Sequence, residues 1–235
     1  MNIAPRRRAL RGAKDRTARF GSHGPRLRLL VVLWLAISLQ ACERVALDER
    51  FHNKELTGWT AVDDPDTLEG PSLWRVEKDG WLHQRSNIWG RRGDFLGRWY
   101  GTYLITGDPV WRDYLVSIKA RPGDNDGFGL VFRWMDGQHF YRLLFIEDEM
   151  NGGPVTRLDK RIGDDYTEIW SLKDGFRAGS EMVIELETSG ETIKGRLNGR
   201  ALFEAMDTTY GMGKVGLFCY AQSDQAFDDV KVIMK

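Results

Sequence analysis

Cysteine is scarce in this chain of 235 residues, which holds only Cys42 and Cys219. A disulfide framework is therefore excluded, and the protein must be stable through its core, which a domain of roughly 190 residues can supply. Cys219 lies within the apolar stretch "KVGLFCY". We expect it to be a buried, unreactive thiol.

An excess of one charge is also lacking, because 34 Lys and Arg residues balance 34 Asp and Glu residues. The basic residues are concentrated at the start, where Asp15 is the single acid among the first 30 residues. Everything after this segment is net acidic. The charge therefore gives no reason to expect nucleic-acid binding.

Familiar catalytic motifs are missing as well. The sequence has no CxxC pair, no HExxH and no glycine loop of the phosphate-binding kind. His52, His83 and His139 follow the basic segment, and none lies in a recognisable Ser or Cys nucleophile context. A metal-assisted enzyme would need clustered His and carboxylates in a cleft, which the sequence does not show.

No apolar run is long enough to span a bilayer comfortably, since the longest, "LLVVLWLAISL", is short. It follows a basic segment and precedes the small residue Ala41, which is the order of a secretory signal. Leu39-Gln40-Ala41-Cys42 resembles the bacterial lipobox, in which the Cys becomes the lipidated first residue. An uncleaved anchor and a start codon placed too early are the alternatives.

The lipobox interpretation divides the chain into three parts. Residues 1–41 are a signal peptide, residues 42–47 are a tether that begins at the lipidated Cys42, and residues 48–235 form one domain. Glu43 follows the Cys. By analogy with bacterial sorting, we expect a lipid-anchored protein of the cell envelope, at the outer membrane or the periplasmic face.

The sequence does contain the patterns that predict β-strands. "DYLVSIKAR" and "EMVIELE" alternate apolar and polar residues, with Val116, Ile184 and Leu186 facing inward. Asn198-Gly199 is a strong two-residue hairpin signal, and "EKDGWLHQ" looks like another hairpin with its turn at Asp79-Gly80. No amphipathic helix of ten or more residues is evident. The pattern predicts an all-β protein, an antiparallel two-sheet jelly-roll sandwich.

Two strands are apolar on both faces. In "FGLVFRW", Phe132 and Trp134 are expected on one face and Val131 on the other. In "HFYRLLFI", Phe140 and Tyr141 are expected on opposite faces. A central strand buried between two layers has this pattern, and so does a strand whose second face lines an aromatic groove.

Five stretches follow one another in a familiar order: "FHNKELTGWTAVD", "SLWRVEKDGWLHQRSN", "DGFGLVFRWMDGQHFYRLLF", "NGRALFEAMD" and "GKVGLFCYAQSDQAFDDVKV". Together they resemble the concanavalin A-like lectin/glucanase superfamily over roughly residues 48 to 234. Laminin G-like domains, thrombospondin carboxy-terminal domains and bacterial 3-keto-disaccharide hydrolase-like domains are similar. This sandwich hosts lectins, glycosidases and adhesion modules alike, so the resemblance implies a fold more than a function.

The resemblance also implies calcium. Thrombospondin-like relatives bind Ca²⁺ with an acidic loop at the position that Asp124 and Asp126 occupy here. Calcium takes about six to eight oxygen ligands, which clustered carboxylates and loop carbonyls can supply. A solvated turn is the alternative. Asp228 is a further candidate, because the spacing of apolar residues around it calls for a β-bulge that would redirect a carboxylate; a simple edge-strand charge is the alternative.

The glucanases of this superfamily place Glu, Asp and Glu on one face of one strand. Glu147 and Glu149 imitate this in part, as do Glu185 and Glu187, but neither pair reproduces the motif. A glucanase of that type is not expected, and the sequence assigns no catalytic residue.

Aromatic residues are the better functional indication, since sugar rings stack on flat apolar rings. The glycine-rich stretch "SNIWGRRGDFLGRWYG" presents Trp89, Trp99 and Tyr100 among charged residues, and Trp134 and Tyr141 would add to it from a concave sheet. Placement in the core is the alternative. The favoured function is a lipoprotein whose sandwich binds carbohydrate or another surface ligand, and the second hypothesis is an enzyme of the keto-sugar kind.

Overall fold

The computed structural model describes residues 43–90 and 98–235. The predicted signal peptide of residues 1–41 and the lipidation of Cys42 lie outside these residues and stay predictions. Over the described part of the chain, no helix has the length and apolar character that crossing a membrane requires.

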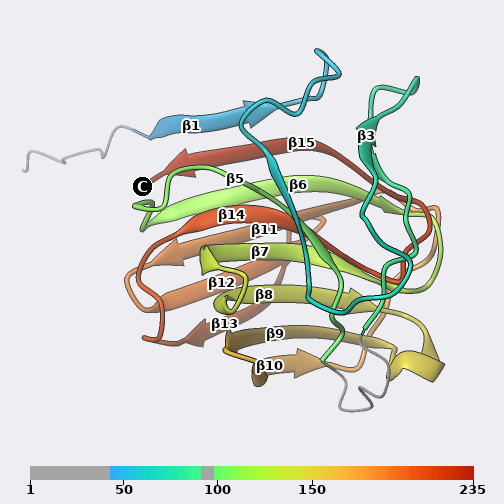
Figure 1. Cartoon of the computed structure of the whole chain (residues 1–235). Helices are drawn as coiled ribbons and strands as arrows, with labels where there is room; N and C mark the ends of the chain where they lie inside the picture. The colour runs from blue at the N-terminus through green and yellow to red at the C-terminus, as the bar shows by residue number, and fades with distance from the viewer. Residues whose placement is uncertain (1–42, 91–97) are drawn as a thin grey trace, which may run out of the picture. The chain divides into compact units, whose positions relative to one another are not determined.

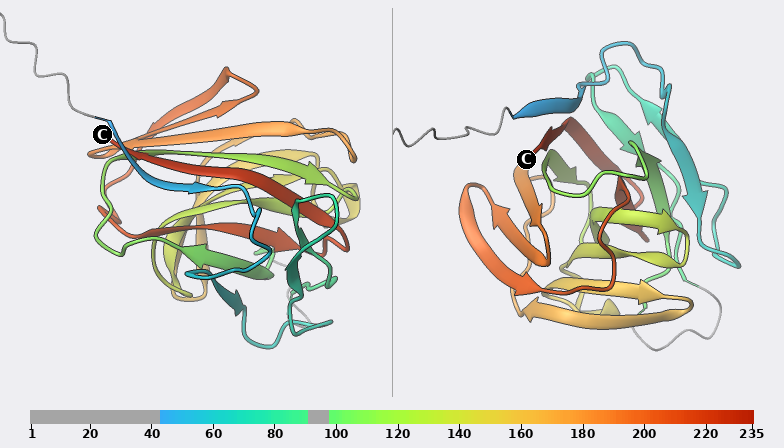
Figure 2. Two further views of the ribbon diagram at one scale, coloured as in Figure 1. Left: turned by 90° about the horizontal axis from the view of Figure 1, so that it is seen from above. Right: turned by 90° about the vertical axis from the view of Figure 1, so that its left-hand side faces the viewer.

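Two antiparallel sheets make up the fold (Figure 1). The first sheet has the strand order β13-β12-β11-β6-β15-β4-β3, and β1 pairs with β15 beside this path. The second sheet has the order β10-β9-β8-β7-β14-β5-β2. The hairpin of β12 and β13 stands at one edge of the first sheet (orange in Figure 2). The predicted all-β jelly-roll sandwich is confirmed.

The strands of the first sheet are β1 Arg44–Glu49, β3 Trp74–Val76, β4 Leu82–Gln84, β6 Tyr114–Pro122, β11 Met182–Ser189, β12 Thr192–Leu197, β13 Arg200–Met206 and β15 Gln225–Met234. Those of the second sheet are β2 Thr60–Asp63, β5 Thr102–Thr106, β7 Gly127–Asp136, β8 His139–Ile146, β9 Val155–Ile162, β10 Asp165–Leu172 and β14 Lys214–Tyr220. A short 3₁₀ helix, η1 (Glu149–Asn151), follows β8.

The main core fills the space between the sheets, as period-two alternation predicts. Ile184 of β11 pairs with Ile118 of β6, and Leu186 pairs with Val116. All four side chains are buried. Complete burial of an aliphatic side chain contributes about 1.5–3 kcal/mol, so rows of this kind stabilise a sandwich without disulfides. Cys219 is buried in the same core, as expected.

Both predicted hairpins are present. Asn198 and Gly199 join β12 to β13 with φ of 52° and 75°. Positive φ at both central residues is what a two-residue hairpin turn requires. The turn at Asp79 and Gly80 joins β3 to β4, and Gly80 has φ of 86°.

The tether predicted for residues 42–47 is wrong from Arg44 onward, because these residues form β1. Arg44 pairs with Met234 and Glu49 pairs with Val230 (blue beside red in Figure 1). The physical reason lies in β15. Its start is flanked by β4, but its later residues would present an open edge if β1 did not cover them.

The second sheet is buried on both faces. Tyr141, Leu143 and Phe145 face the main core, whereas Phe140 and Leu144 belong to a separate aromatic cluster on the outer face. This confirms the predicted split of β8 and favours the strand buried between two layers over an open groove. The segment at residues 98–100 lies over the outer face, where its backbone carbonyls accept hydrogen bonds from Arg142.

The predicted face of Trp134 is wrong. Phe132 packs in the main core, but Trp134 packs in the outer aromatic cluster. Arg133, between them, has φ of 45°, and the pairing of β14 with β7 shifts register next to it. A β-bulge of this kind interrupts the alternation and turns the following side chain to the other face.

Candidate functional site

One row of side chains crosses four strands of the first sheet on its outer face. Arg75 of β3 is opposite His83 of β4, His83 is opposite Ala226 of β15, and Ala226 is opposite Arg121 of β6. Their neighbours along each strand, such as Leu82 and Phe227, point into the main core. Alternation therefore collects charged groups from distant segments on one surface, around the small side chain of Ala226.

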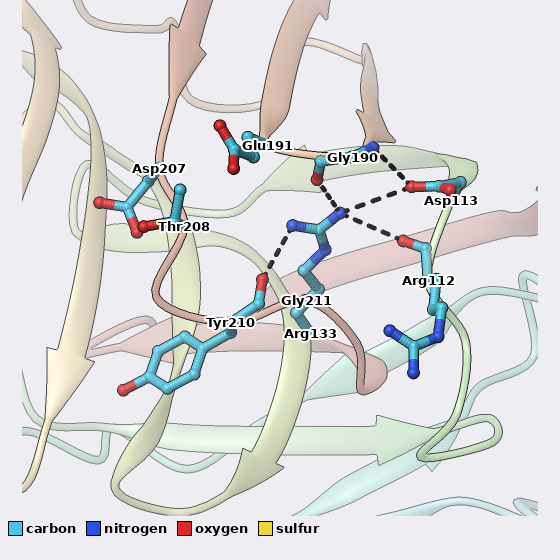
Figure 3. A pocket seen from close by; sticks show the side chains of 9 residues that line it. All are labelled: Arg112, Asp113, Arg133, Gly190, Glu191, Asp207, Thr208, Tyr210 and Gly211. Atoms are coloured by element: carbon cyan, nitrogen blue, oxygen red, sulfur yellow. Dashed lines mark hydrogen bonds and ion pairs between the residues drawn. The ribbon is translucent and has the colours of Figure 1, made fainter.

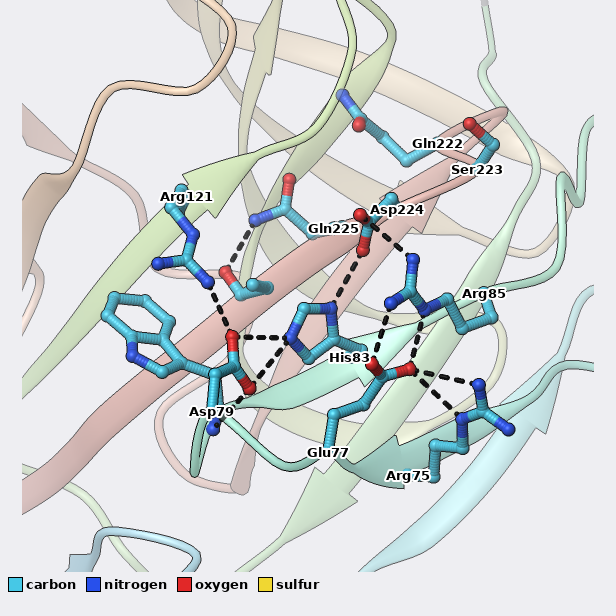
Figure 4. A network of polar contacts seen from close by, with 12 residues as sticks. Arg75, Glu77, Asp79, His83, Arg85, Arg121, Gln222, Ser223, Asp224 and Gln225 are labelled. Carbon is cyan, nitrogen blue, oxygen red and sulfur yellow. Dashed lines mark hydrogen bonds and ion pairs between the residues drawn. The ribbon is translucent and has the colours of Figure 1, made fainter.

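Carboxylates join these cations into a chain of alternating charge (Figure 4). Arg121 donates to Asp79 over 2.7 Å, and Asp79 lies 3.2 Å from Nε2 of His83. Nδ1 of His83 lies 2.7 Å from Asp224, whose other oxygen is 2.9 Å from Arg85. The His83 imidazole is thus held between two carboxylates.

The chain of alternating charge continues from Arg85 to Glu77. Arg85 donates two hydrogen bonds of 2.7 Å to the Glu77 carboxylate, which is the bidentate geometry that suits a guanidinium and a carboxylate. Arg75 donates to the same carboxylate over 3.1 Å. The hydrogen bond from Arg85 is the main cause that lowers the pKa of Glu77 to about 2, against the opposing effect of burial. The Glu77 carboxylate therefore stays charged throughout the physiological range.

The pKa of Asp79 is lowered too. Burial alone would raise it, but the backbone N–H of Trp81 and the side chains of His83 and Arg121 together outweigh burial. Two of the three carboxylates in the chain are thus stabilised in the charged form by the donors around them. The arrangement offers fixed acceptors and donors side by side, which is what polar ligand groups require.

An open cleft of about 800 Å³ lies beside this chain of alternating charge. Its size falls in the range of about 300–1,000 Å³ that is usual for ligand sites. The lining side chains are Lys54, Arg75, Val76, Glu77, Lys78, Asp79, His83, Arg85, Arg121 and Asp224. The described lining includes no Phe, Tyr or Trp. Trp81 stands next to the cleft, with the guanidinium of Arg121 4.5 Å from its ring centre.

The aromatic residues singled out from the sequence lie elsewhere. Trp89 is 40% exposed. The other four are buried, which contradicts the expected open platform; they are Trp99, Tyr100, Trp134 and Tyr141. Residues 91–97 of the same stretch lie outside the described part. Contact between a ligand and any of these five aromatic residues stays a prediction.

Each buried ring has internal partners that explain its position. Nε1 of Trp99 donates to the carbonyl of Asn151, and the Tyr100 hydroxyl donates to the carbonyl of Asp164. The Tyr141 hydroxyl donates to Asp207 over 2.6 Å. Burying a Tyr or Trp with its polar atom satisfied is stable, because the ring leaves water while the hydrogen bond is kept.

In the acidic loop expected to bind calcium, the carboxylates accept hydrogen bonds from nearby groups of the protein. Asp124 accepts from the backbone N–H of Asp126 and from Ser223, and Asp126 accepts from the side chain of Asn151. The pKa of Asp126 is raised to about 6, first by burial and then by the charges of Asp124 and Asp148. Negative charge converges here, as a cation site needs, but the described residues include no group of three or more acidic, His or Cys side chains able to hold a metal.

The bulge predicted near Asp228 is confirmed. The pairing of β15 with β6 shifts register after Asp228, and Asp229 has φ of 47°. Asp229 forms ion pairs with Lys119 and Arg50, whereas Oδ1 of Asp228 is buried without a hydrogen-bond partner among the described residues. Asp228 itself still pairs with Lys119, so the bulge falls after it, at Asp229, and calcium binding by Asp228 stays a prediction.

A second, smaller cavity of about 270 Å³ surrounds the buried Arg133 (Figure 3). Its guanidinium donates to the carbonyl of Tyr210 over 2.8 Å and to that of Gly190 over 2.7 Å, and lies 3.7 Å from Asp113. The side chain therefore ties three loops together. We assign it a structural role, because both terminal nitrogens of its guanidinium donate to carbonyls of the protein's own backbone.

The cleft residues were missed because their proximity depends on long-range strand pairing. "WRVEKDGWLHQR" shows a hairpin with charges on one face, and that signal was available in the sequence. Nothing local indicates that Asp224 and Arg121 join the same surface. His83 and its two carboxylate partners therefore share one cleft, although they do not form a group able to hold a metal among the described residues.

No protein-family model matches this chain, and a search of curated proteins gives no match. Solved structures are similar in fold. The carbohydrate-binding module CBM66 from Bacillus subtilis has a TM-score of 0.58 and 17% identity, covering 74% of this chain and 93% of that one. A protein of unknown function with a galectin-like fold, also from Bacillus subtilis, has a TM-score of 0.55 and 13% identity, covering 82% and 99%.

Domain 4 of AbnA, an extracellular arabinanase from Geobacillus stearothermophilus solved in complex with arabinotriose, has a TM-score of 0.50 and 16% identity, covering 82% of this chain and 93% of that domain. Identities this low establish the fold alone. The chain has the lectin- and glucanase-like β-sandwich fold.

Proposed function

We propose that this protein binds carbohydrate in the cleft around His83. The observation that carries the proposal is the chain of alternating donors and acceptors that lines an open cleft of about 800 Å³. Sugar hydroxyls both donate and accept, so paired carboxylates and guanidinium groups can bind them on adjacent atoms. The likeness to a carbohydrate-binding module and to a domain solved with arabinotriose supports the same assignment.

Glycan-array screening of the domain, followed by calorimetry on the best ligand, tests the proposal. Arg75→Gln removes an exposed guanidinium from the cleft lining, and it should weaken binding about tenfold or more, since a hydrogen bond to a charged group contributes about 1.5–3 kcal/mol. Lys173→Gln, which removes an exposed cation just after β10 on the second sheet, is the matched control. Equal affinity of both variants for the ligand would reject the cleft as the site.

A glycoside-processing enzyme of the 3-keto-disaccharide hydrolase type is the second candidate. The specific observation in its favour is that His83 lies between Asp79 and Asp224 in an open cleft, because such groups can transfer protons. Incubation with reducing glycans and 3-keto-glucosides distinguishes the two functions. Product formation that His83→Gln abolishes would establish the enzyme, and saturable binding without product would establish the binding module.

Attachment to the cell envelope through a lipid on Cys42 is part of the same proposal. It rests on the sequence around residues 39–42, at the start of a domain whose first described strand begins at Arg44. Cys42→Ser should move the protein from the membrane fraction to the soluble fraction. Unchanged fractionation would reject the lipid anchor.

Calcium is proposed as a stabilising ion. The converging charges of Asp124, Asp126 and Asp148, and the unpartnered oxygen of Asp228, support it. A chelator should lower the melting temperature of protein purified with calcium, because an ion that binds only the folded state stabilises it by mass action. A melting temperature that is the same with calcium and with chelator would reject the proposal.

A further inference from the structure

The charge of the cleft is opposite to that of the domain around it. Over residues 43–90 and 98–235 the sequence holds 23 Lys and Arg and 32 Asp and Glu. The cleft lining instead holds five cationic side chains and three carboxylates, with His83 in addition. A local excess of positive charge on an acidic domain raises the local concentration of anions.

The cations of the cleft are not all neutralised. Lys54 and Lys78 are exposed and form no ion pair within the described part of the chain. Arg75, whose side chain is 56% exposed, shares the single carboxylate of Glu77 with Arg85. At least three basic groups can therefore receive a further anionic partner without breaking an existing bidentate pair.

The carboxylates, by contrast, are already engaged. Glu77 accepts from two guanidinium groups, Asp79 accepts from Arg121 and the backbone N–H of Trp81, and Asp224 pairs with Arg85. The lowered pKa of Glu77, about 2, agrees with this surplus of donors. Glu181 stands at the rim, 3.9 Å from Arg121, and is 60% exposed, so solvent screens its charge.

The lining also limits how a sugar could be held. Without a Phe, Tyr or Trp in the described lining, stacking contributes little, and affinity must come from hydrogen bonds and charge. Charge-assisted hydrogen bonds to carboxylate or sulfate are stronger than those to a neutral hydroxyl. A ligand that carries such groups can pair with Lys54 and Lys78, and a neutral glycan cannot use their charge.

We propose that the preferred ligand of this cleft is an anionic glycan, one whose sugar units carry carboxylate or sulfate groups. This inference rests on the proposed carbohydrate binding and names its ligand class. It goes beyond the fold relatives, and nothing in their likeness to this chain determines the charge of the ligand.

Binding of the full domain is measured by calorimetry against polygalacturonate, dextran sulfate, neutral dextran, neutral arabinan and double-stranded DNA, at about 50 and about 200 mM salt. We expect one of the two anionic glycans to bind at least tenfold more tightly than the neutral ones, with affinity that falls as salt rises. The polygalacturonate and dextran sulfate arms distinguish carboxylate from sulfate recognition.

Substitutions then place the charge effect in the cleft. Lys54→Gln and Lys78→Gln should each weaken binding of the anionic glycan by about 2- to 5-fold, the size of an exposed ion pair. Lys173→Gln removes an exposed lysine that follows β10 on the second sheet and should change nothing. If Lys173→Gln weakens binding of the anionic glycan as much as Lys54→Gln and Lys78→Gln do, the inference is overturned.

The outcomes separate the two levels of the claim. Tight binding of a neutral glycan with weak binding of both anionic ones would overturn the anionic preference and leave the carbohydrate proposal standing. No binding of any glycan would reject both. Equal binding of DNA and anionic glycan would overturn glycan recognition in favour of general polyanion binding.

Discussion

Asp126 gives the sharpest test of the electrostatics in this fold. Its pKa is raised to about 6 from an ordinary 3.8, because the carboxylate is half-buried and faces the charges of Asp124 and Asp148. A carboxyl group whose folded pKa lies above its unfolded value binds protons more tightly in the folded state. Stability from this group is therefore highest below about pH 4 and is lost as pH rises through about 6.

The size of the effect follows from the shift. About two pKa units correspond to a ceiling of about 3 kcal/mol, at roughly 1.4 kcal/mol per unit. Solvent screens a half-buried group, so we expect about 1 kcal/mol. Asp126→Asn removes the charge and keeps an acceptor for Asn151. In chelator at pH 8 the variant should melt about 2–4 °C higher than the unsubstituted protein, and at pH 4 the two should melt together.

Thermal melts with chelator, at pH 4 and pH 8, measure this difference, and Asp165→Asn serves as the control on an exposed strand position. A variant that is less stable than the unsubstituted protein at pH 8 in chelator would refute the reasoning. Repeating the melts in calcium tests the proposed ion in the same experiment. If calcium binds Asp126, the sign reverses there, because the substitution removes a ligand and with it the stabilisation by mass action.

Three further substitutions test the packing. Ile184→Ala should cost about 2–5 kcal/mol in urea unfolding, since it leaves a cavity in the main core, whereas Val183→Ala, at a partly exposed neighbour, should cost far less. Arg142→Met should destabilise by about 3 kcal/mol in the same assay, because it removes a wholly buried partner of the buried Asp159. Trp89→Ala should leave the melting temperature within about 1 °C, since the ring is 40% exposed, and an unfolded variant would show that the ring belongs to the core.

The fold could be predicted where the information is local. Alternation in β6 and β11 gave the inward residues correctly, and Asn198-Gly199 located a hairpin, because side-chain direction and turn dihedrals depend on neighbouring residues. The bulge beside Asp228 was predicted from the apolar spacing around it. The bulge at Arg133 was not predicted, because the sequence Phe-Arg-Trp fits regular alternation. The alternation is interrupted only by the register shift in the pairing of β7 with β14.

The candidate site could not be predicted for a different reason. Arg121 and Asp224 come from segments that are far in sequence from Asp79 and His83, and they meet them only because β15 lies between β4 and β6. Strand order in a sandwich is a property of the whole chain. A local sequence pattern predicts which side chains point away from the core, but it does not predict which side chains of other strands lie next to them.

The two sheets show that an arginine on an outer face has a structural role where another segment buries it, and is open to a ligand where it stays exposed. Arg142 and Arg161 lie on the outer face of the second sheet, where both are buried and bonded to Asp159, Asp64 and nearby carbonyls. The segment at residues 98–100 lies over them, so their donors serve the fold.

On the outer face of the first sheet, Arg85 and Arg121 keep about a third of their side-chain surface exposed beside the cleft. The same charge-assisted chemistry is there open to a ligand. Exposure therefore makes the arginines of the first sheet, rather than those of the second, the candidates for ligand contact. The proposed anionic glycan would also contact Lys54 and Lys78, which form no ion pair within the described residues.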